Sequence, residues 1–327
     1  MTAEPRPPLL VICGPTATGK TEVGIEVALP LGGEIVGADS MQVYRHLDIG
    51  TAKPTPQQRA RVPHHLVDYV EPDEPYSVAR YKEDAEGALA DLRARGKLPL
   101  MVGGTGLYLR AVVDQLDLPI AAADWDLRRQ LEDEAQRRGA DWLRERLRAV
   151  DPVAAERIDP HNVRRVVRAL EVYLLTGRPF SSHHALDQRR EAKYNLLAFG
   201  LTVEREGLYR RIEARCDAMM AASLLAEVRS LLERGYGEDL IPMKGLGYRH
   251  LIGHLRGRWD LETAVAMFKR DTRRYARRQW TWFRADARIQ WLDVGGSSAP
   301  EIAATIAQGA QALRPGAHTQ PNFDVPR

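Results

Sequence analysis

The sequence predicts an α/β fold with a mainly parallel sheet. Short apolar runs alternate with helix-like segments along the first third of the chain, and this order is typical of parallel strands connected by helices. The first apolar run, Leu9 to Cys13, leads directly into Gly14 to Thr21, which matches the phosphate-loop pattern G-x-x-x-x-G-K-[ST]. A strand, a phosphate loop and a helix in this order predict a P-loop core similar to that of nucleotide kinases.

Each expected element follows from the apolar pattern. Residues 9–13 and 98–102 are apolar runs of strand length, whereas residues 20–29 and 76–95 have the longer, charge-interrupted pattern of helices. From residue 124 the sequence pattern changes to amphipathic segments rich in Arg and Glu. The other expected elements are a strand at 34–38, helices within 124–178, a strand at 196–202, helical stretches at 205–234 and 260–285, and a last strand at 289–294.

These elements divide the chain into a core and an insertion. We expect a P-loop catalytic core at residues 1–120 and 196–295, interrupted by an all-helical insertion domain at 121–195. Residues 1–8 are Pro-rich and are expected to be disordered. Residues 296–327 are rich in Gly, Ala, Ser and Pro, and we expect them to form a flexible tail.

The composition favours an ordinary soluble enzyme. The 327 residues are 44% hydrophobic and 28% charged, and the net charge of +3 is too small to indicate a nucleic-acid partner by itself. Cys13 and Cys216 provide neither a disulfide framework nor a Cys-based metal site. No apolar stretch is long enough to span a membrane, and the N-terminus lacks the pattern of a signal peptide. We therefore expect a cytoplasmic protein without a membrane partner, and a monomer.

The phosphate loop predicts a ligand that carries a diphosphate or triphosphate. Its glycines let successive N–H groups turn towards a phosphate, and the N-terminus of the following helix adds a favourable dipole. Lys20 supplies a positive charge, and the Thr21 hydroxyl can bind Mg²⁺. The expected diphosphate-binding residues are Gly14, Pro15, Thr16, Ala17, Thr18, Gly19, Lys20 and Thr21.

A carboxylate is expected beside this loop. Asp39 follows the strand at 34–38, and ligands of open α/β sheets bind where the carboxyl ends of the strands meet. The strand at 98–102 ends in Gly103-Gly104 instead of the acid that holds Mg²⁺ in a typical P-loop ATPase. From the residues alone, Asp39 can bind Mg²⁺, accept a proton from a nucleophile, or cap a turn.

Residues 264–290 form a basic segment with interleaved aromatic side chains, as expected for a surface that follows RNA phosphates. The alternative is a solvated amphipathic helix whose aromatics lie in the core, and Trp280 is expected to pack this helix against the sheet. A second basic cluster extends from Arg164 to Arg168. On a helix, five basic residues of the first segment share one face: Arg270, Arg273, Arg274, Arg277 and Arg278.

Several blocks, in the same order along the chain, resemble the tRNA dimethylallyltransferase (tRNA isopentenyltransferase) family. The resemblance runs from about residue 10 to residue 292, and the blocks are highly specific in combination. They are GPTATGKT at 14–21, DSMQVYR at 39–45, DIGTAKP at 48–54, PHHL at 63–66, VGGTGLY at 102–108, RALEV at 168–172, GYR at 247–249 and RQWTWF at 278–283. Ser223 departs from the pattern, because relatives often have Gly there.

The resemblance implies a reaction and a set of substrates. Dimethylallyl diphosphate is the donor, Mg²⁺ is the cofactor, and the acceptor is N6 of the adenine at position 37, next to the tRNA anticodon. The reaction is a prenyl transfer. By their match to the family blocks, Asp39 resembles the general base, Thr16 a catalytic threonine, and Arg215 the arginine that helps Lys20 to hold the diphosphate. Eukaryotic relatives often carry a C-terminal zinc finger, which this sequence lacks.

The resemblance also implies which residues contact the anticodon stem-loop. The amide of Gln42 is suited to an adenine edge, because an amide can form two hydrogen bonds with it. The helical insertion is expected to take part in tRNA binding. The full expected set is Asp39, Ser40, Met41, Gln42, Thr105, Arg164, Arg165, Val166, Val167, Arg168, Lys244, Gly247, Tyr248, Arg249, Arg277, Arg278, Gln279, Trp280, Thr281, Trp282, Phe283 and Arg284.

Three alternatives remain open at this point. An adenylate dimethylallyltransferase that acts on free AMP or ATP shares the phosphate loop and the aspartate. A P-loop small-molecule kinase, or a P-loop RNA-binding module without activity, can also use the loop. Two histidine pairs, His64-His65 and His183-His184, lack acidic or Cys partners at metal-ligand spacing, so we expect surface or RNA contacts there rather than a metal site.

Overall fold

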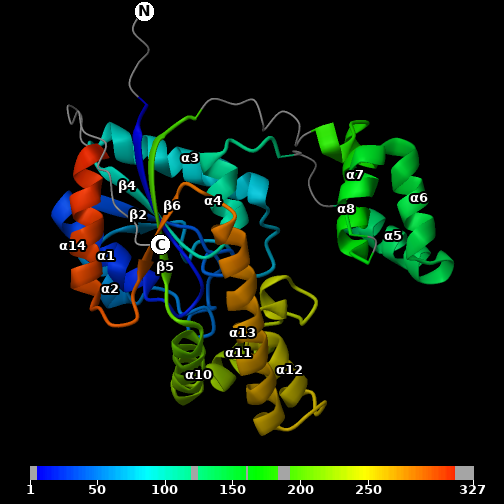
Figure 1. Cartoon of the computed structure of the whole chain (residues 1–327). Coiled ribbons are helices and arrows are strands. Elements are labelled where there is room, and N and C mark those ends of the chain that lie inside the picture. The colour runs from blue at the N-terminus through cyan, green and yellow to red at the C-terminus, as the bar shows by residue number, and fades with distance from the viewer. Residues whose placement is uncertain (1–5, 119–123, 160, 183–191, 314–327) are drawn as a thin grey trace, which may run out of the picture. The chain divides into compact units, whose positions relative to one another are not determined.

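The computed structural model describes residues 6–118, 124–159, 161–182 and 192–313 (Figure 1). The chain forms two compact units. The sheet unit consists of residues 1–76, 83–109 and 194–327, and the helical unit of residues 77–82 and 110–193. Residues 110–118, which the sequence analysis assigned to the core, thus belong to the helical unit.

The sheet unit is built on six parallel strands in the order β3-β2-β4-β1-β5-β6. This confirms the predicted α/β fold with its P-loop kinase-like sheet. The central strands are almost entirely buried, as expected when helices cover both faces of a parallel sheet. The strands are β1 (Pro8–Cys13), β2 (Gly33–Gly37), β3 (His64–His65), β4 (Leu98–Val102), β5 (Asn195–Thr202) and β6 (Ile289–Asp293).

The strand register brings three loops to one edge of the sheet. Val102 of β4 pairs with Ile12 of β1 on one side and with Gly37 of β2 on the other. The three strands therefore end at the same level. The segments that follow them are the phosphate loop, the loop that begins at Asp39 and the glycine-rich turn that begins at Gly103, and these build the site described below.

Helices occupy most of the remaining described chain. Their apolar faces pack towards the sheet or towards one another, and α3 and α4 are shared between the two units. The helices of the sheet unit, with these two, are α1 (Lys20–Leu31), α2 (Pro56–Arg61), α3 (Val78–Ala94), α4 (Gly106–Val113), α10 (Arg205–Ala221), α11 (Leu224–Glu233), η1 (Pro242–Lys244), α12 (Tyr248–Leu255), α13 (Leu261–Arg284), α14 (Ala299–Ala310) and η2 (Gln311–Leu313).

The expected flexible tail is wrong for residues 299–310. They form α14, which packs against α1, as Figure 1 shows. Ile302 and Ile306 lie one helical turn apart and are buried, so the helix has an apolar face. The pattern is weak in the sequence because most other residues of the helix are small. Ser298 and Glu301 form a capping box at its start, with the Ser298 N–H donating to Glu301 Oε2 at 2.8 Å.

The long helical stretch expected at 205–234 is interrupted. Helix α10 ends at Ala221, and Ser223 adopts φ +73° before α11 begins. This is the left-handed region that favours glycine, which accounts for the glycine that relatives often have at this position. The serine therefore makes the same turn at some cost in backbone strain.

The helical unit contains α5 (Trp125–Arg138), α6 (Ala140–Val150), α7 (Pro152–Arg157) and α8 (Val163–Thr176). Its own core includes Leu131, Leu143 and Leu147. The buried carboxylate of Glu171 accepts hydrogen bonds from the Asp124 N–H at 2.8 Å and from Arg128 Nε at 2.9 Å. A buried charge that is paired in this way fixes the first helix of the unit to the last.

Candidate active site

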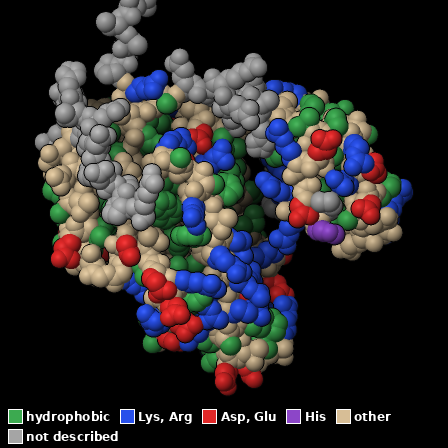
Figure 2. Space-filling model, viewed as in Figure 1, with side chains coloured by type: hydrophobic (Ala, Val, Ile, Leu, Met, Phe, Trp, Pro, Cys, Tyr) green, Lys and Arg blue, Asp and Glu red, His purple; other side chains and the backbone are tan. Residues whose placement is uncertain are grey.

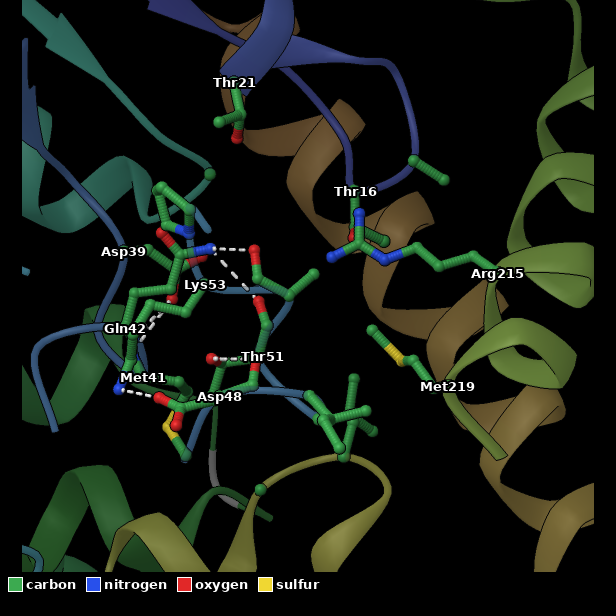
Figure 3. A pocket seen from close by; sticks show the side chains of 18 of the residues that line it. Thr16, Thr21, Asp39, Met41, Gln42, Asp48, Thr51, Lys53, Arg215 and Met219 are labelled. Carbon is green, nitrogen blue, oxygen red and sulfur yellow. Dashed lines mark hydrogen bonds and ion pairs between the residues drawn. The ribbon is translucent and has the colours of Figure 1, made fainter. Parts of the chain in front are cut away.

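A cavity of about 930 Å³ opens where the carboxyl ends of β1, β2 and β4 meet in the sheet unit. The phosphate loop forms one side and the segment 39–55 forms the other. Helices α10, α12 and α13 close the remaining sides. The sequence motifs expected to bind diphosphate and to remove a proton therefore face the same space (Figure 3).

The phosphate loop is shaped by backbone conformations that only some residues adopt easily. Gly14 has φ +134°, and a Cβ at this position would lie 2.4 Å from the Leu201 carbonyl oxygen. Gly19 has φ +84°, and Ala17 adopts φ +65° between them. The Lys20 ammonium donates to the Pro15 carbonyl at 2.7 Å, which ties the first helical turn back over the loop.

Two cations converge on this loop. Burial, together with the neighbouring Arg215 guanidinium, lowers the pKa of Lys20 to about 8, although Asp39 opposes this shift. Arg215 extends from α10 towards Thr16 (Figure 3), and no ion pair joins it to another described residue. Burial also lowers the pKa of Arg215. Two partly buried cations that form no ion pair with a described residue make a site that an anionic ligand stabilises.

Asp39 lies across the cavity from the loop. One carboxylate oxygen, Oδ1, accepts hydrogen bonds from the Met41 N–H at 2.9 Å and the Gln42 N–H at 3.4 Å. The Ser40 N–H donates to Thr105 Oγ1 at 3.0 Å, so the turn after β4 supports the turn after β2. The second oxygen, Oδ2, has no hydrogen bond to another described residue. This oxygen is available to a substrate proton.

The side-chain amide of Gln42 forms hydrogen bonds within the protein. Its side-chain Nε2 donates to the carbonyl oxygens of Thr51 and Ala52, both at 3.1 Å. The expected pairing of this amide with an adenine edge would require both bonds to break. In this structure Gln42 instead fixes the segment 48–54 against the Asp39 turn.

Two residues that were not expected as site residues shape the segment 48–54, which lies across the cavity from the phosphate loop and is called the acceptor wall below. Lys53 is buried and donates to Asp48 Oδ1 at 2.6 Å, to Asp68 Oδ1 at 2.7 Å and to the Tyr44 carbonyl at 2.7 Å. Lys53 lies in the block DIGTAKP at 48–54, which resembles the family, so the sequence did contain a signal that this residue belongs to the site. Its role is to hold the wall rather than to bind phosphate.

Glu227 on α11 is the second missed residue. Its carboxylate accepts from the backbone N–H groups of Asp48, Ile49 and Gly50 at 2.8–3.2 Å. The Tyr248 hydroxyl donates to the same carboxylate at 2.6 Å. A single acid on an amphipathic helix has no sequence feature that distinguishes it from a solvated one, so only the fold identifies this contact.

The third side of the cavity is apolar. Met41 and Ile49 line it from the segment 39–55, Met219 from α10, Leu246 from the turn before α12, and Phe268 from α13. This surface adjoins the Arg215 guanidinium, as Figure 3 shows for Met219. A ligand with an anionic head and a short hydrocarbon tail matches a cation pair beside an apolar wall.

Comparison with known proteins identifies the family. A model described as IPP transferase matches residues 42–286, and a model described as isopentenyl transferase matches residues 7–63. The chain belongs to the tRNA dimethylallyltransferase family. The tRNA dimethylallyltransferase of Desulforudis audaxviator is 54% identical over 308 residues, which cover 92% of this chain and 98% of the relative.

Solved structures of tRNA dimethylallyltransferases agree with this assignment. The full-length tRNA isopentenylpyrophosphate transferase of Bacillus halodurans is 41% identical, with a TM-score of 0.69 over 94% of this chain and 97% of that one. A eukaryotic dimethylallyltransferase acting on tRNA is 27% identical, with a TM-score of 0.78 over 94% of this chain and 80% of that one. The resemblance inferred from the sequence blocks is confirmed.

For a tRNA dimethylallyltransferase, several residues expected to contact tRNA lie in the interior. Val166 and Val167 are 2% and 1% exposed in the core of the helical unit, because they occupy the apolar face of α8. Phe283 is 3% exposed on the inner face of α13. Tyr248 is 1% exposed and bonded to Glu227. These side chains are therefore not accessible to RNA.

Helix α13 carries much of the basic surface of the sheet unit, as Figure 2 shows. Arg277 and Arg278 are exposed, and neither forms an ion pair with a described residue. Arg273 is instead paired with Glu213 of α10, and Arg274 lies 3.4 Å from Asp271. The five basic residues expected to share one face are thus partly neutralised, by Asp271 on the same helix and by Glu213 from α10.

The expectation that Trp280 packs α13 against the sheet is wrong. Trp280 is 38% exposed, and the Arg284 guanidinium lies 4.8 Å from its ring centroid. Trp282 is 42% exposed and lies over Gly106, where a Cβ would be 2.1 Å from the indole Nε1. The helix is anchored by Phe268, Ala276 and Phe283 instead, which are all buried.

Other expected contacts lie in η1 and at the start of α12 in the sheet unit, and at the start of α8 in the helical unit. Lys244 and Arg249 are exposed, and Arg249 is paired with Asp271 at 2.7 Å. Arg164 and Arg165 are exposed at the start of α8. Gly247 adopts φ +86°, so it turns the chain into α12 rather than contributing a side chain.

The histidine pair His64-His65 has structural contacts. His64 Nδ1 lies 2.7 Å from the Val62 carbonyl, and His65 Nε2 lies 2.7 Å from Glu34 Oε2. Among the residues described, no group of three or more His, Cys, Asp or Glu side chains could hold a metal ion. His183 and His184 lie outside the described residues. No helix in the described ranges is long and apolar enough to cross a membrane.

Proposed function

We propose that this chain transfers a dimethylallyl group from dimethylallyl diphosphate to N6 of adenine 37 of tRNA and releases diphosphate. The observation that carries the proposal is the position of Asp39 across one cavity from Lys20, Arg215 and the phosphate loop. A carboxylate and a cation-lined anion site on opposite sides suit a reaction in which one substrate loses a proton and the other loses an anion.

The donor fits the cationic side of the cavity. Its diphosphate would contact the N–H groups of the loop, Lys20 and Arg215, and its five-carbon tail would lie on the apolar side beside Met219. As the allylic C–O bond breaks, negative charge gathers on the leaving diphosphate. Fixed donors and cations stabilise that charge without reorganising, which lowers the barrier.

The acceptor fits the Asp39 side. The lone pair of the adenine amine is delocalised into the ring, so N6 is a poor nucleophile. Removal of a proton as the C–N bond forms compensates for this weakness when the base lies about 3 Å from N6. Asp39 Oδ2 would take that proton, while Oδ1 remains bonded to the Met41 N–H.

The family implies Mg²⁺, and the residues present are compatible with it. The Thr21 hydroxyl lines the cavity at the start of α1 and has no hydrogen bond to a described residue. A hard oxygen next to a diphosphate site suits Mg²⁺, which binds few protein ligands and several phosphate oxygens. Thr21 would hold the ion with the diphosphate, and the bound ion would neutralise charge on the leaving group.

The alternative acceptors are free AMP or ATP. We favour tRNA because α13 exposes Arg277, Arg278 and Trp280. Together they form a basic and aromatic surface that is larger than a mononucleotide occupies. The target adenine would leave its stack to reach Asp39.

One experiment separates the candidate acceptors. The protein is incubated with labelled dimethylallyl diphosphate and Mg²⁺, together with tRNA, AMP or ATP. Label in tRNA at adenine 37 is expected. Label in AMP or ATP would assign the chain to the free-nucleotide reaction, and consumption of ATP with phosphorylation of an acceptor would assign it to the kinases.

The tRNA surface on α13 has a test of its own. Log affinity for RNA falls with log salt by about 0.7–0.9 for each neutralised phosphate. Replacing Arg277 and Arg278 by Ala should therefore reduce the slope by roughly 1–2 units. The matched control replaces Arg229 on α11 and Arg234 just after it, which are also exposed and without an ion pair to a described residue. An unchanged slope in the Arg277/Arg278 variant would leave tRNA binding to other surfaces.

A further inference from the structure

Gln279 occupies the inner face of α13, between two exposed neighbours. Arg278 and Trp280 are exposed, whereas Gln279 is 6% exposed. Their adjacency in one sequence block predicts tRNA contact for all three. Their directions differ because successive residues on a helix point about 100° apart.

Both ends of the Gln279 amide are used within the protein. Its Oε1 accepts from the Thr16 N–H at 2.9 Å, and its Nε2 donates to the Gly104 carbonyl oxygen at 2.9 Å. Thr16 belongs to the phosphate loop after β1, and Gly104 to the turn after β4. One side chain from the basic helix therefore joins two of the three loops that build the cavity.

The fit around this amide is tight. A Cβ at Gly104 would lie 2.4 Å from Gln279 Nε2, so glycine is needed for the bond to form as observed. The next residue in the same turn, Thr105, accepts from the Ser40 N–H at 3.0 Å. Hydrogen bonds thus run from Thr16 through Gln279 and the 104–105 turn to the residue beside Asp39.

We propose that Gln279 is a positioning residue that fixes the Thr16 turn of the phosphate loop relative to the Asp39 turn. It sets the separation of the leaving group and the general base without touching either substrate. The Thr16 N–H is held by α13, so Thr16 faces the donor through its hydroxyl rather than its amide. This inference rests on the proposed function, because it assigns the two turns to donor and acceptor.

The decisive variant is Gln279→Met, which keeps the length of the side chain and removes both hydrogen bonds. A misplacement of about 1 Å can lower a rate roughly 10²-fold. We expect kcat to fall roughly 10- to 100-fold, while the dissociation constant for tRNA changes less than about twofold. Gln308→Met on α14 makes the same substitution on an exposed site and is expected to change neither.

A double-mutant cycle gives a readout that a purely structural role would not change. If Gln279 acts through Thr16, adding Gln279→Met to Thr16→Ala should lower kcat by no more than about twofold. Gly104→Ala pushes the amide away without altering Gln279 and should reproduce the loss of kcat. Additive effects in the cycle, or a loss of tRNA affinity with normal kcat, would overturn the proposal.

Failure of the proposed function would look different. In that case the wild-type protein would transfer no label to tRNA. The role of Gln279 can still be measured then by titration with inorganic diphosphate and Mg²⁺. Several-fold weaker binding by Gln279→Met than by Gln308→Met supports the proposal, and equal binding overturns it.

Discussion

The donor side and the acceptor side of the cavity are held in place by different means. The phosphate loop is shaped by its own backbone, with Gly14 and Gly19 at positive φ and Lys20 bonded back to Pro15. The acceptor wall at 48–54 depends on long-range side-chain contacts, chiefly those of Glu227 from α11 with its backbone and of its own buried Lys53 with Asp68. Local spacing thus encodes most of the first structure, with Gln279 of α13 as its long-range support, whereas the second depends on contacts that form only after the chain has folded.

This difference predicts how each side fails. A substitution on the donor side should change chemistry or donor binding and leave folding intact. A substitution that removes a long-range support of the acceptor wall should affect stability as well as activity. The following predictions test that contrast, from the largest expected effect to the smallest.

Asp39→Ala should lower turnover by roughly 10²–10⁴, the usual contribution of a positioned general base. Among the described residues, its carboxylate accepts hydrogen bonds only from the amides of its own turn, so the melting temperature should change little. Single-turnover transfer to tRNA, with circular dichroism as the folding control, measures both. Near-normal turnover would remove Asp39 from the chemistry.

Arg215→Ala should weaken donor binding roughly 10- to 100-fold, since a hydrogen bond to a charged group contributes about 1.5–3 kcal/mol. Arg215→Lys should restore only part of it, because an ammonium cannot form the two-pronged contact of a guanidinium. Titration with dimethylallyl diphosphate gives the donor affinity, and tRNA binding is the control. A variant that binds the donor normally but no longer binds tRNA would show that the donor and tRNA sites are assigned to the wrong sides of the cavity.

Glu227→Gln should lower the free energy of unfolding by about 1–3 kcal/mol and reduce activity, because three amides and the Tyr248 hydroxyl lose a charged acceptor. Denaturant titration and transfer assays are compared with Glu233→Gln, an exposed acid on the same helix. If both variants have the same free energy of unfolding, the acceptor wall does not depend on this carboxylate, and the two sides of the cavity do not differ in how they are supported.

Donor binding should take up a proton at alkaline pH. The pKa of Lys20 is about 8 without ligand, so part of this ammonium is neutral at pH 8.5. A bound diphosphate favours the charged form and raises the pKa, whereas at pH 6.5 the group is already charged and uptake should vanish. Calorimetry in two buffers with different ionisation heats measures the uptake, at most about one proton. Lys20→Arg should abolish it, and persistent uptake in that variant would assign the proton to another group.

The sequence predicted features that depend on neighbouring residues. The apolar runs predicted the sheet, and the loop spacing predicted the side of the cavity that carries Lys20. The position of Asp39 followed from parallel topology, since strand ends meet at one edge. The assignment of Arg215 rested on the family resemblance alone.

Long-range contacts were not predictable in the same way. Gln279 was assigned to RNA, because a sequence block does not reveal which way each helical side chain points. Val166 and Val167 were assigned to RNA for the same reason. Helix α14 was overlooked because only Ile302 and Ile306 are large on its apolar face, and the Ala and Gly beside them also occur in flexible segments.

The contact between Gly50 and Tyr248 constrains how the acceptor wall can evolve. A Cβ at residue 50 would lie 2.6 Å from the Tyr248 ring, and Tyr248 is buried. The two positions are therefore complementary in size, and a larger residue at one requires a smaller residue at the other. In a library that varies both positions together, functional members should show inverse side-chain volumes at 50 and 248, although these residues lie almost two hundred positions apart in the chain.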